Sequence, residues 1–543
     1  MDRFIKKTKD LIFAQQGGIF SSALIISTMI VISSMFGFLR YRILAGYFTK
    51  EELDIYFAAF RIPDLIFEIL ITGALTTSFI PVIIKYQKNK EELDQHVSSI
   101  FNLLMITLSI IVIVLFFCMD FIIPLVTPGF KGEKLSLVIM YSKILLISQL
   151  PFLVAGNVLT GIAQAKKTFL ITAAAPVLYN LAVIISTLLF TSTLHLLAPV
   201  LGVAAGAVIF FVIQLPVLLT FNINYRLIIK YTDGVRDFFK LIGPRILTVI
   251  VSQIDATIDL SLTSLLGSGA YTVFYFAQHL QLLPVSVVGI AFGQASLPYL
   301  SELYEQNKIE DLKNIIIDSL LKMLFFAIPV AFFFIFARTP LIRIFFGGEK
   351  FDWDATVQTA YALSYFALSL PFHTVYYFIT RCFYALLDSK TPFIISLLTV
   401  TINTLLSLYF VLVAKLPIWS LAISFSLSVV LNTTVLFVLL VIKLKNIKLT
   451  FFITETAKII MIAFIATPPA YYLIKLMDNL LLDTTRSLNV FLLLASSAIA
   501  YFLLYLILAW FFNIKEMYAI SHLFTRAKMF QKKILEITSY DQT

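Results

Sequence analysis

The sequence predicts an all-α membrane protein with about fourteen transmembrane helices, and two observations carry that prediction. Apolar stretches of roughly 18 to 28 residues recur along the whole chain, and a helix needs about 20 apolar residues to cross the hydrocarbon core of a bilayer. Basic residues gather in nearly every second connection between these stretches. This alternation predicts that the basic connections and both termini lie in the cytoplasm.

The predicted spans follow one another with short connections, so no water-soluble domain of useful size fits between them. The composition agrees, because 60% of the residues are hydrophobic and 13% are charged, a balance typical of a chain whose solvent is mainly lipid. The first stretch follows a basic start but is too long for a signal peptide, so we expect a permanent helix there. The spans lie near residues 19–40, 55–84, 98–124, 136–163, 170–191, 197–221, 241–266, 271–300, 315–346, 356–384, 391–413, 417–442, 453–475 and 486–512.

The charge and cysteine content argue against several classes of function. The net charge of +10 sits in short juxtamembrane loops rather than on one face of a domain, so we expect anionic membrane lipids as partners and no nucleic acid. The two cysteines, Cys118 and Cys382, have no CxxC or Cys/His spacing, which argues against a disulfide or zinc. We expect no enzyme, because the sequence shows no nucleophile–base arrangement, phosphate loop or metal cluster.

An internal similarity divides the chain into halves. Residues 161–180 and 381–403 both show a span that ends in small and polar residues, then a lysine, Thr and Phe. In each, a new span carries an asparagine about ten residues later, at Asn180 and Asn403. Six spans separate the two copies, so we predict two six-helix bundles with a solute path between them, as in many transporters. The alternative is that short turns converge on such residues without a repeat.

The predicted domains follow from that division. They are an N-terminal six-helix bundle at 1–225, a C-terminal six-helix bundle at 226–448, a terminal helix pair at 449–513 and a cytoplasmic tail at 514–543.

Charged residues inside the first two spans are candidates for substrate binding, because a charge in lipid is costly. Arg40 lies near the end of the first span and Arg42 follows it. A guanidinium group suits a diphosphate, and the alternative is a side chain that snorkels to the interface. In the second span Arg61, Asp64 and Glu68 share one helical face. Arg61 could therefore pair with Asp64 rather than with a ligand.

Other residues of the second span point to a moving or substrate-lining helix. Asp54 precedes the span and could either hold an arginine in place or cap the helix. Pro63 removes a backbone donor inside the span, while Gly73 and Ala74 permit close approach of a neighbouring helix. We expect the same close packing at three small residues of other spans, Gly37, Gly289 and Gly293.

The seventh and eighth predicted spans carry titratable groups. Asp255 and Asp259 lie one turn apart, and two carboxylates on one intramembrane face suit a cation or a proton. His279 could titrate near neutral pH, although a lone histidine in a span is more often a packing residue.

These residues lie in blocks that resemble the MurJ (MviN) family of lipid II flippases, within the multidrug/oligosaccharidyl-lipid/polysaccharide exporter superfamily. The blocks run in order between about residues 25 and 445: GFLRYRILAGYF, LDIYFAAFRIPDL and GALTTSFIPV within 37–82, the two repeat segments, GPRILTVIVSQIDATID at 243–259, and YFAQHLQLLPVSVVGIAFGQASLPYLSEL at 275–303. The resemblance implies a fourteen-helix protein of the bacterial inner membrane. Such a protein moves the undecaprenyl-pyrophosphate-linked peptidoglycan precursor, lipid II, from the inner to the outer leaflet.

The resemblance also implies roles for particular residues. Three arginine positions of the family hold Ser34, Phe67 and His279 here, and Gln278 stands where the family has an aspartate. Arg40 keeps its place, and Ser407 stands where the family can have an acid. Thr72 stands at a further acidic position of the family. The substrate-binding candidates are Arg40, Arg61, His279, Asp54 and Thr72, and the candidate sodium ligands are Asp259, Asn403 and Ser407.

Three functions fit this sequence. The first is a lipid II flippase for peptidoglycan synthesis. The second is an exporter of another polyprenyl-linked saccharide or of an organic cation, for which Asp255 and Asp259 would matter more than Arg40. The third is a scaffold without transport activity that holds cell-wall synthesis enzymes together. We expect no cofactor other than a sodium ion, and the membrane potential is an alternative energy source because one charge crossing 100 mV gains about 2.3 kcal/mol.

Overall fold

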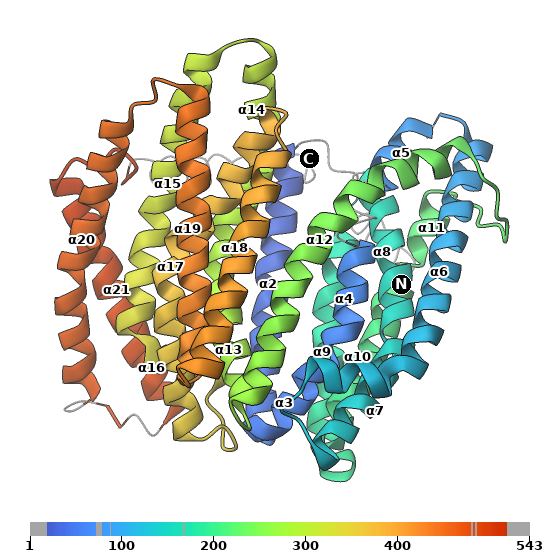
Figure 1. The fold of residues 1–543 in the computed structure, drawn as a ribbon, viewed down its shortest axis with the longest axis horizontal. Helices are drawn as coiled ribbons and strands as arrows, with labels where there is room; N and C mark the ends of the chain where they lie inside the picture. Colours follow the sequence, from blue (N-terminus) through green and yellow to red (C-terminus); the bar gives the residue numbers. More distant parts are fainter. Residues whose placement is uncertain are drawn as a thin grey trace, which may run out of the picture. The chain divides into compact units, whose positions relative to one another are not determined.

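The predicted all-α membrane fold is confirmed. The computed structural model describes residues 19–71, 79–86, 88–166, 168, 170–478, 482–483 and 486–517. Across these residues every regular element is helical, and ten helical stretches are long and apolar enough to cross a membrane (Figure 1). Each of the fourteen expected spans falls on one helix or on a few consecutive helices.

The chain divides into two compact units. Unit 1 comprises Met1–Val273 together with Phe345–Ala355, and unit 2 comprises Phe274–Ile344 together with Thr356–Thr543. The division falls inside one helix, α13 (Ala270–Pro284). The segment Phe345–Ala355, which we call the returning loop, joins α16 (Arg338–Phe346) to α17 (Trp353–Ala385) but packs with unit 1.

Unit 1 is a bundle of long helices with close contacts through small residues. A Cβ added at Gly206 of α10 would meet the Tyr179 carbonyl of α9 at 2.9 Å, and one at Gly202 would meet the Val183 Cα at 2.9 Å. Such close approach is how helices associate in lipid. The helices are α2 (Ile19–Tyr47), α3 (Lys50–Ala59), α4 (Arg61–Leu70), α5 (Ile80–Tyr86), α6 (Lys90–Val126), α7 (Gly132–Ser148), α8 (Leu150–Ala165), α9 (Leu170–Leu194), α10 (Leu197–Val212), α11 (Pro216–Thr220) and α12 (Asp233–Leu265).

The second predicted span is interrupted where its sequence favours a break. Thr49 and Glu52 form a capping box that starts α3, with Glu52 N–H donating to Thr49 Oγ1 at 3.3 Å and Thr49 N–H to Glu52 Oε2 at 2.8 Å. This helix ends at Phe60, and α4 begins at Arg61 with Pro63 in its first turn, where its missing N–H leaves no helical bond broken. The interruption therefore lies just before Pro63.

Asn180, one of the two repeat asparagines, ties α9 to the first helix of unit 1. Its Nδ2 donates to the Pro176 carbonyl at 3.1 Å and to the Ser33 carbonyl of α2 at 3.4 Å. The first of these bonds lies within α9, and the second joins α9 to α2. Gly37 of α2 lies opposite, with a built Cβ 4.0 Å from Asn180 Nδ2.

Unit 2 is a second bundle, also joined by small residues. Cβ atoms added at Gly289 and Gly293 would meet carbonyl oxygens of α17 at 2.7 and 3.2 Å, so the predicted close packing at these two glycines is confirmed. Gly73 and Ala74, predicted for the same role, lie outside the described residues. The elements after α13 are a π-helical segment η2 (Val285–Ile290), α14 (Ala291–Glu305), α15 (Ile309–Phe336), α16, α17, α18 (Lys390–Leu408), a π-helical segment η3 (Tyr409–Val413), α19 (Trp419–Leu444), α20 (Leu449–Leu476) and α21 (Ser487–Phe511).

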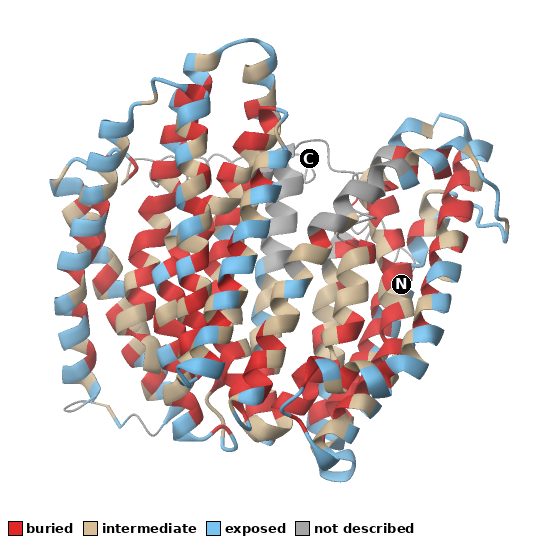
Figure 2. Ribbon diagram, viewed as in Figure 1, coloured by how far each residue is buried: buried red, intermediate tan, exposed pale blue. Residues whose placement is uncertain are grey.

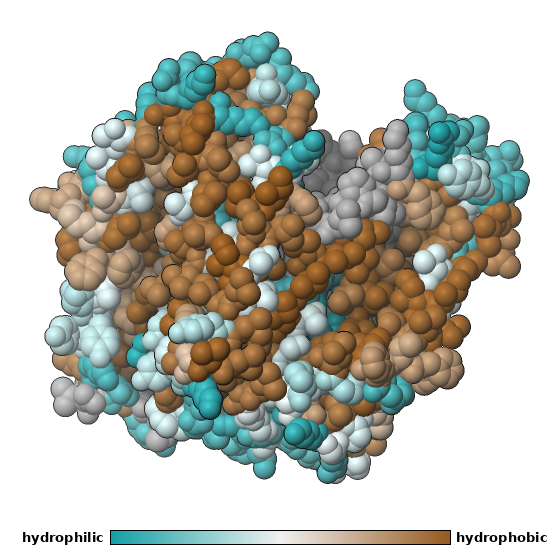
Figure 3. Space-filling model, in the orientation of Figure 1, coloured by the Kyte–Doolittle hydropathy of each residue, from teal (hydrophilic) through white to brown (hydrophobic). Residues whose placement is uncertain are grey.

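The surfaces of both units suit a lipid solvent. Figure 2 shows buried residues on the inner faces of the helices and exposed ones along α6 and α20. Many of the exposed side chains are large and apolar, such as Phe117 at 75% and Phe121 at 77% on α6. Figure 3 shows hydrophobic residues across the middle of the visible face and hydrophilic residues toward its upper and lower ends. This distribution is that of a protein with a hydrocarbon belt.

Candidate substrate site

Two arginines stand near the end of α2 in unit 1. Arg40 and Arg42 are both half-buried. The Arg40 guanidinium carbon lies 4.8 Å from the centroid of the buried Tyr41 ring, close enough for a cation–π contact. Because residues two apart on a helix face in different directions, Arg40 and Arg42 occupy different surroundings. This makes the pair a matched test of position.

Asp54 is a fully buried carboxylate at the centre of a hydrogen-bond cluster. Its Oδ2 accepts from Lys134 Nζ at 2.8 Å and from Gly269 N–H at 2.7 Å, and its Oδ1 accepts from Thr272 N–H at 2.8 Å. Gly269 and Thr272 stand at the start of α13, so Asp54 satisfies free N–H groups at the end of a helix distant in sequence. Its own helix, α3, is capped by Thr49 instead, and the cationic partner of Asp54 is Lys134 rather than an arginine.

A second ion-pair cluster lies beside this one on the returning loop. Lys50 Nζ lies 3.4 Å from Asp352 Oδ2 and 3.0 Å from Asp354 Oδ2. Desolvation alone would lower the pKa of Lys50, but its hydrogen bonds and Coulomb attraction to both aspartates outweigh that effect and raise the pKa. Gly348 packs against the α2 backbone, where a built Cβ would come within 2.4 Å of the Ala45 carbonyl. The returning loop is thus held to α2 and α3 by charge and by shape.

Arg61 joins α4 to α12. Its Nε donates to Thr257 Oγ1 at 3.0 Å, and its Nη2 donates to the Gln253 carbonyl at 2.8 Å and to Gln253 Oε1 at 2.6 Å. The guanidinium group is therefore held by α12. Asp64 and Glu68, on the same face of α4, are half-buried. This arrangement brings the charged face of the second predicted span against the seventh.

The remaining candidates of unit 1 are two aspartates and Thr72. Asp255 and Asp259 lie on α12, with Asp255 half-buried and Asp259 buried. The backbone carbonyl of Asp259 accepts from Thr263 Oγ1 at 2.7 Å. Thr72 lies outside the described residues. Hence unit 1 brings Arg61 onto the helix that carries both aspartates, whereas the structure describes nothing at Thr72.

Three further candidates belong to unit 2. His279 of α13 is half-buried, with Nδ1 2.9 Å from the Tyr275 carbonyl and its ring stacked on Tyr275 at 3.8 Å. Asn403 and Ser407 are both buried on α18, and Ser407 Oγ lies 2.6 Å from Ser424 Oγ of α19. The hydroxyl of Ser407 is thus already engaged by another hydroxyl. Asp259, the third candidate sodium ligand, belongs to unit 1.

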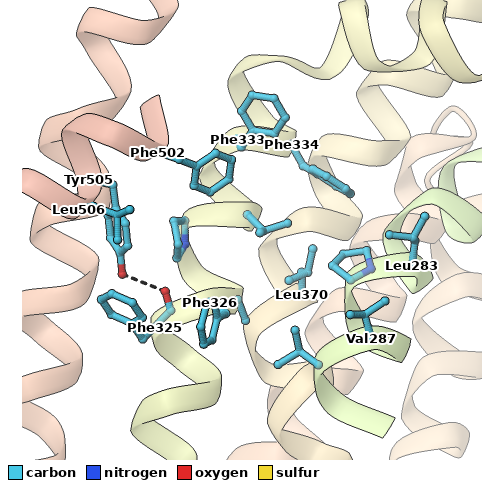
Figure 4. A pocket seen from close by; sticks show the side chains of 15 residues that line it. Leu283, Val287, Phe325, Phe326, Phe333, Phe334, Leu370, Phe502, Tyr505 and Leu506 are labelled. Atoms are coloured by element: carbon cyan, nitrogen blue, oxygen red, sulfur yellow. Dashed lines mark hydrogen bonds between the residues drawn. The ribbon is translucent and has the colours of Figure 1, made fainter. Parts of the chain in front are cut away.

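Sequence reasoning missed an apolar cavity in unit 2. The cavity has a volume of about 450 Å3 and lies among α13, η2, α15, α17 and α21 (Figure 4). Its walls are aromatic and aliphatic side chains, including Leu283, Val287, Phe326 and Phe502. Nothing in the spacing of these residues distinguishes them from ordinary lipid-facing or core positions.

One polar contact stands at the edge of this cavity. Pro329 has no N–H, so the carbonyl of Phe325, four residues earlier in α15, loses its helical partner. Tyr505 of α21 donates its hydroxyl to that carbonyl at 2.9 Å (Figure 4). A proline in one helix is therefore compensated by a tyrosine from another, which fixes α21 against α15 at the cavity.

Comparisons with known proteins agree with this architecture. The chain matches the family model described as "Lipid II flippase MurJ" over residues 45–492. It is 28% identical over 399 residues to a probable lipid II flippase MurJ of Rickettsia prowazekii (strain Madrid E), covering 72% of this chain and 78% of that relative. It is 26% identical over 434 residues to the lipid II flippase MurJ of Burkholderia cenocepacia, covering 77% and 83% respectively.

Solved structures give the same picture. A structure described as "Lipid II flippase MurJ, inward closed conformation" superposes with a TM-score of 0.74 at 26% identity, covering 90% of this chain and 98% of that one. An inward-facing multidrug resistance MATE family transporter of the MOP superfamily superposes with a TM-score of 0.65 at 15% identity, over 79% of this chain, which shows a shared fold.

Proposed function

We propose that this chain, which belongs to the lipid II flippase MurJ family, moves lipid II from the inner to the outer leaflet of the bacterial inner membrane by alternating access. The observation that carries the proposal is the match to a solved flippase over 90% of this chain at 26% identity. Both termini then lie in the cytoplasm, as the basic loops predict. Cell-wall synthesis enzymes would act before and after this step.

The chemistry of such a substrate supports the proposal. A polyprenyl diphosphate carries a long apolar tail and two phosphates. The apolar cavity of unit 2, at about 450 Å3, suits a segment of such a tail. The half-buried arginine at position 40 offers a fork of donors that suits a diphosphate. We assign the phosphate contact to Arg40.

The other candidates receive narrower roles. Arg61 binds α12 in this conformation, so we propose that it offers its guanidinium group to substrate only when Gln253 and Thr257 release it. His279 would add a charge near the diphosphate when protonated, and Thr72 would add a hydroxyl. Asp54 holds helix ends and Lys134 together, so its contribution to binding is the position of α3.

For sodium, the residues of this chain fit poorly. A sodium site needs several oxygen ligands around one ion, preferably with a carboxylate. Of the three candidates, Ser407 brings a neutral hydroxyl that already contacts Ser424. Asp259 would supply the only carboxylate and Asn403 one carbonyl. We therefore propose that the membrane potential, rather than a sodium gradient, biases the return of the empty protein.

Complementation tests the proposal. The essential flippase of a bacterial host is depleted while this chain is expressed, and growth and lipid II translocation are measured. We expect rescue by the natural chain and by Arg42→Ala, and loss of rescue by Arg40→Ala. A buried arginine–phosphate contact contributes about 1.5 to 3 kcal/mol, or roughly ten- to hundredfold in affinity.

The outcomes separate the alternatives. Equal loss in the two arginine variants at equal membrane expression would overturn the role of Arg40. No rescue by the natural chain would instead favour an exporter of another lipid-linked saccharide or of an organic cation, or a scaffold. Export assays would tell the first two from the third.

A further inference from the structure

A segment of irregular backbone in unit 1 lies along the end of α6 nearest Lys90. This segment, Ile223–Tyr231, joins α11 to α12 and is here called the strap (Figure 1). The basic loops assign this end of α6 to the cytoplasm. The strap therefore lies where the protein leaves the membrane.

Side chains of α6 hold the strap by its backbone. Asn224 N–H donates to Asp94 Oδ1 at 3.2 Å and Arg226 N–H to Ser98 Oγ at 3.0 Å. Asn102 Nδ2 donates to the carbonyls of Arg226 and Ile228 at 3.0 and 2.9 Å.

These four α6 bonds fix the strap in place. Lys230 N–H adds a longer contact to Ser99 Oγ at 3.4 Å. The α6 partners are polar residues buried under the strap. Their burial shows that this end of α6 is built to hold the backbone of the strap.

With its backbone bound to α6, the strap leaves most of its side chains exposed, including several large apolar ones. Leu227 is 88% exposed, Ile229 58% and Tyr231 79%, whereas Tyr225 turns back to α6 and donates its hydroxyl to Asn102 Oδ1 at 2.7 Å. Arg226 and Lys230, between them, are also exposed. Residues 222–231 contain no aspartate or glutamate. The exposed side chains of the strap are thus both apolar and cationic, a combination that suits a membrane surface with anionic lipid headgroups.

The exposed apolar residues of α6 indicate how deep in the membrane the strap lies. Exposed apolar residues run from Ile106 to Leu125, a helical length of about 29 Å at 1.5 Å per residue. That length matches the hydrocarbon thickness of about 30 Å. Asn102 stands one turn before Ile106, about 6 Å farther out. The part of the strap bound to Asn102 therefore lies at headgroup level.

The strap also lies on the lipid side of α6. Ser99, Ile106, Ile113 and Phe117 are spaced by seven, seven and four residues, and such positions share one face of a helix. The last three are exposed apolar residues, whereas Ser99 is buried and contacts Lys230 N–H. The strap thus covers the end of the face that meets lipid along the rest of the helix.

We propose that the strap is a binding site for anionic phospholipid headgroups. Arg226 and Lys230 contact the phosphates, while Leu227 and Ile229 enter the boundary between headgroups and acyl chains. The occupant is a membrane surface rather than a soluble protein, because the strap shares both its depth and its helix face with the hydrocarbon belt. This site is separate from the proposed path of the transported lipid and does not depend on it.

The test places a fluorescent reporter on the strap. Trp353, Trp419 and Trp510 are replaced by phenylalanine in the full chain, Leu227→Trp is added, and the protein is reconstituted in vesicles of zwitterionic and anionic phospholipid. In one preparation the anionic lipid carries bromine, which quenches tryptophan on contact, and in the other the zwitterionic lipid does. Gln306→Trp, in the exposed turn after α14, serves as the control.

We expect strong quenching at position 227, weak quenching at 306, and at 227 a preference for the brominated anionic lipid. The preference should correspond to roughly fivefold local enrichment, the factor expected for one basic residue at an anionic surface. Arg226→Gln with Lys230→Gln should remove the preference, whereas Lys308→Gln with Lys445→Gln, an equal loss of charge elsewhere, should keep it. A monodisperse elution profile of each variant in detergent confirms that the chain folds.

Two results would overturn the proposal. Quenching at 227 no stronger than at 306 would place the strap in water. Equal quenching by both brominated lipids would show contact with lipid but no selection of anionic headgroups. Failure of the flippase proposal would change neither measurement, because both report on binding rather than transport.

Discussion

Replacing Asp54 with asparagine should destabilise the protein far more than the same change at an exposed carboxylate. The Asp54 side chain is completely buried and accepts from Lys134, Gly269 N–H and Thr272 N–H. An amide of the same shape has one acceptor oxygen, so in either orientation at least one of these donors faces an NH2 group. Hydrogen bonds to charged groups contribute about 1.5 to 3 kcal/mol each, and removing one partner of a buried ion pair costs about 3 to 5 kcal/mol.

We therefore expect Asp54→Asn to cost about 3 kcal/mol, a fall in melting temperature of roughly 6 to 12 °C for a unit of this size. The matched control is Asp352→Asn. Asp352 is 58% exposed in its pair with Lys50, a class of pair that contributes about 0 to 1 kcal/mol. Asparagine there can still accept from Ala355 N–H at the start of α17.

The assay is the fraction of full-length protein that stays monodisperse in detergent after heating, measured against temperature for each variant. Lys134→Met, alone and with Asp54→Asn, completes a double-mutant cycle. The two changes should be strongly non-additive because they remove the same bond. A fall for Asp54→Asn no larger than that for Asp352→Asn would refute the assignment of Asp54 as an ionised anchor of the α13 terminus.

Three further predictions concern packing, pH and ions. Gly129→Ala should lower stability sharply, because a Cβ there would come within 1.9 Å of the Ser264 carbonyl; an unchanged melting temperature would contradict that packing. Burial alone would raise the pKa of Asp388, but hydrogen bonds from Lys443 and Thr391 outweigh it and lower the pKa to about 2. Its stabilisation is therefore fully present above the unfolded pKa of about 3.9 and is lost only as pH falls through about 2. The loss of stability in Asp388→Asn should thus be constant between about pH 5 and 8, and a loss that varies there would point to another group. Transport in proteoliposomes should persist when sodium is removed at fixed membrane potential, and its collapse would show that a sodium site forms after all.

The sequence was a good guide wherever local pattern decides structure. Long apolar runs predicted the helices, and Pro63 marked a span that the structure interrupts at Phe60. The small residues Gly289 and Gly293 indicated close packing because only a missing side chain allows a backbone so near.

Contacts between segments that lie far apart in the sequence could not be predicted from the sequence. Asp54 and Gly269 are 215 positions apart, and Arg61 meets Gln253 across 192. From the sequence, each of these charged residues could have paired with a nearer partner, as the alternative pairing of Arg61 with Asp64 illustrates. The hydrogen bond at the edge of the cavity could not be predicted either, because only the fold brings the Tyr505 hydroxyl to the Phe325 carbonyl, whose helical partner is missing at Pro329.

The returning loop has a consequence for the order in which the chain can assemble. Unit 1 ends its main run at Val273 but is complete only when Phe345–Ala355 has been made. Until then Lys50 lacks Asp352 and Asp354, and Ala45 lacks the backbone of Gly348. At synthesis rates of about 5 to 20 residues per second, the intervening 80 or so residues take roughly 4 to 16 s. During that interval the corner between α2 and α3 is without the two ion pairs and the backbone contact that the returning loop later supplies.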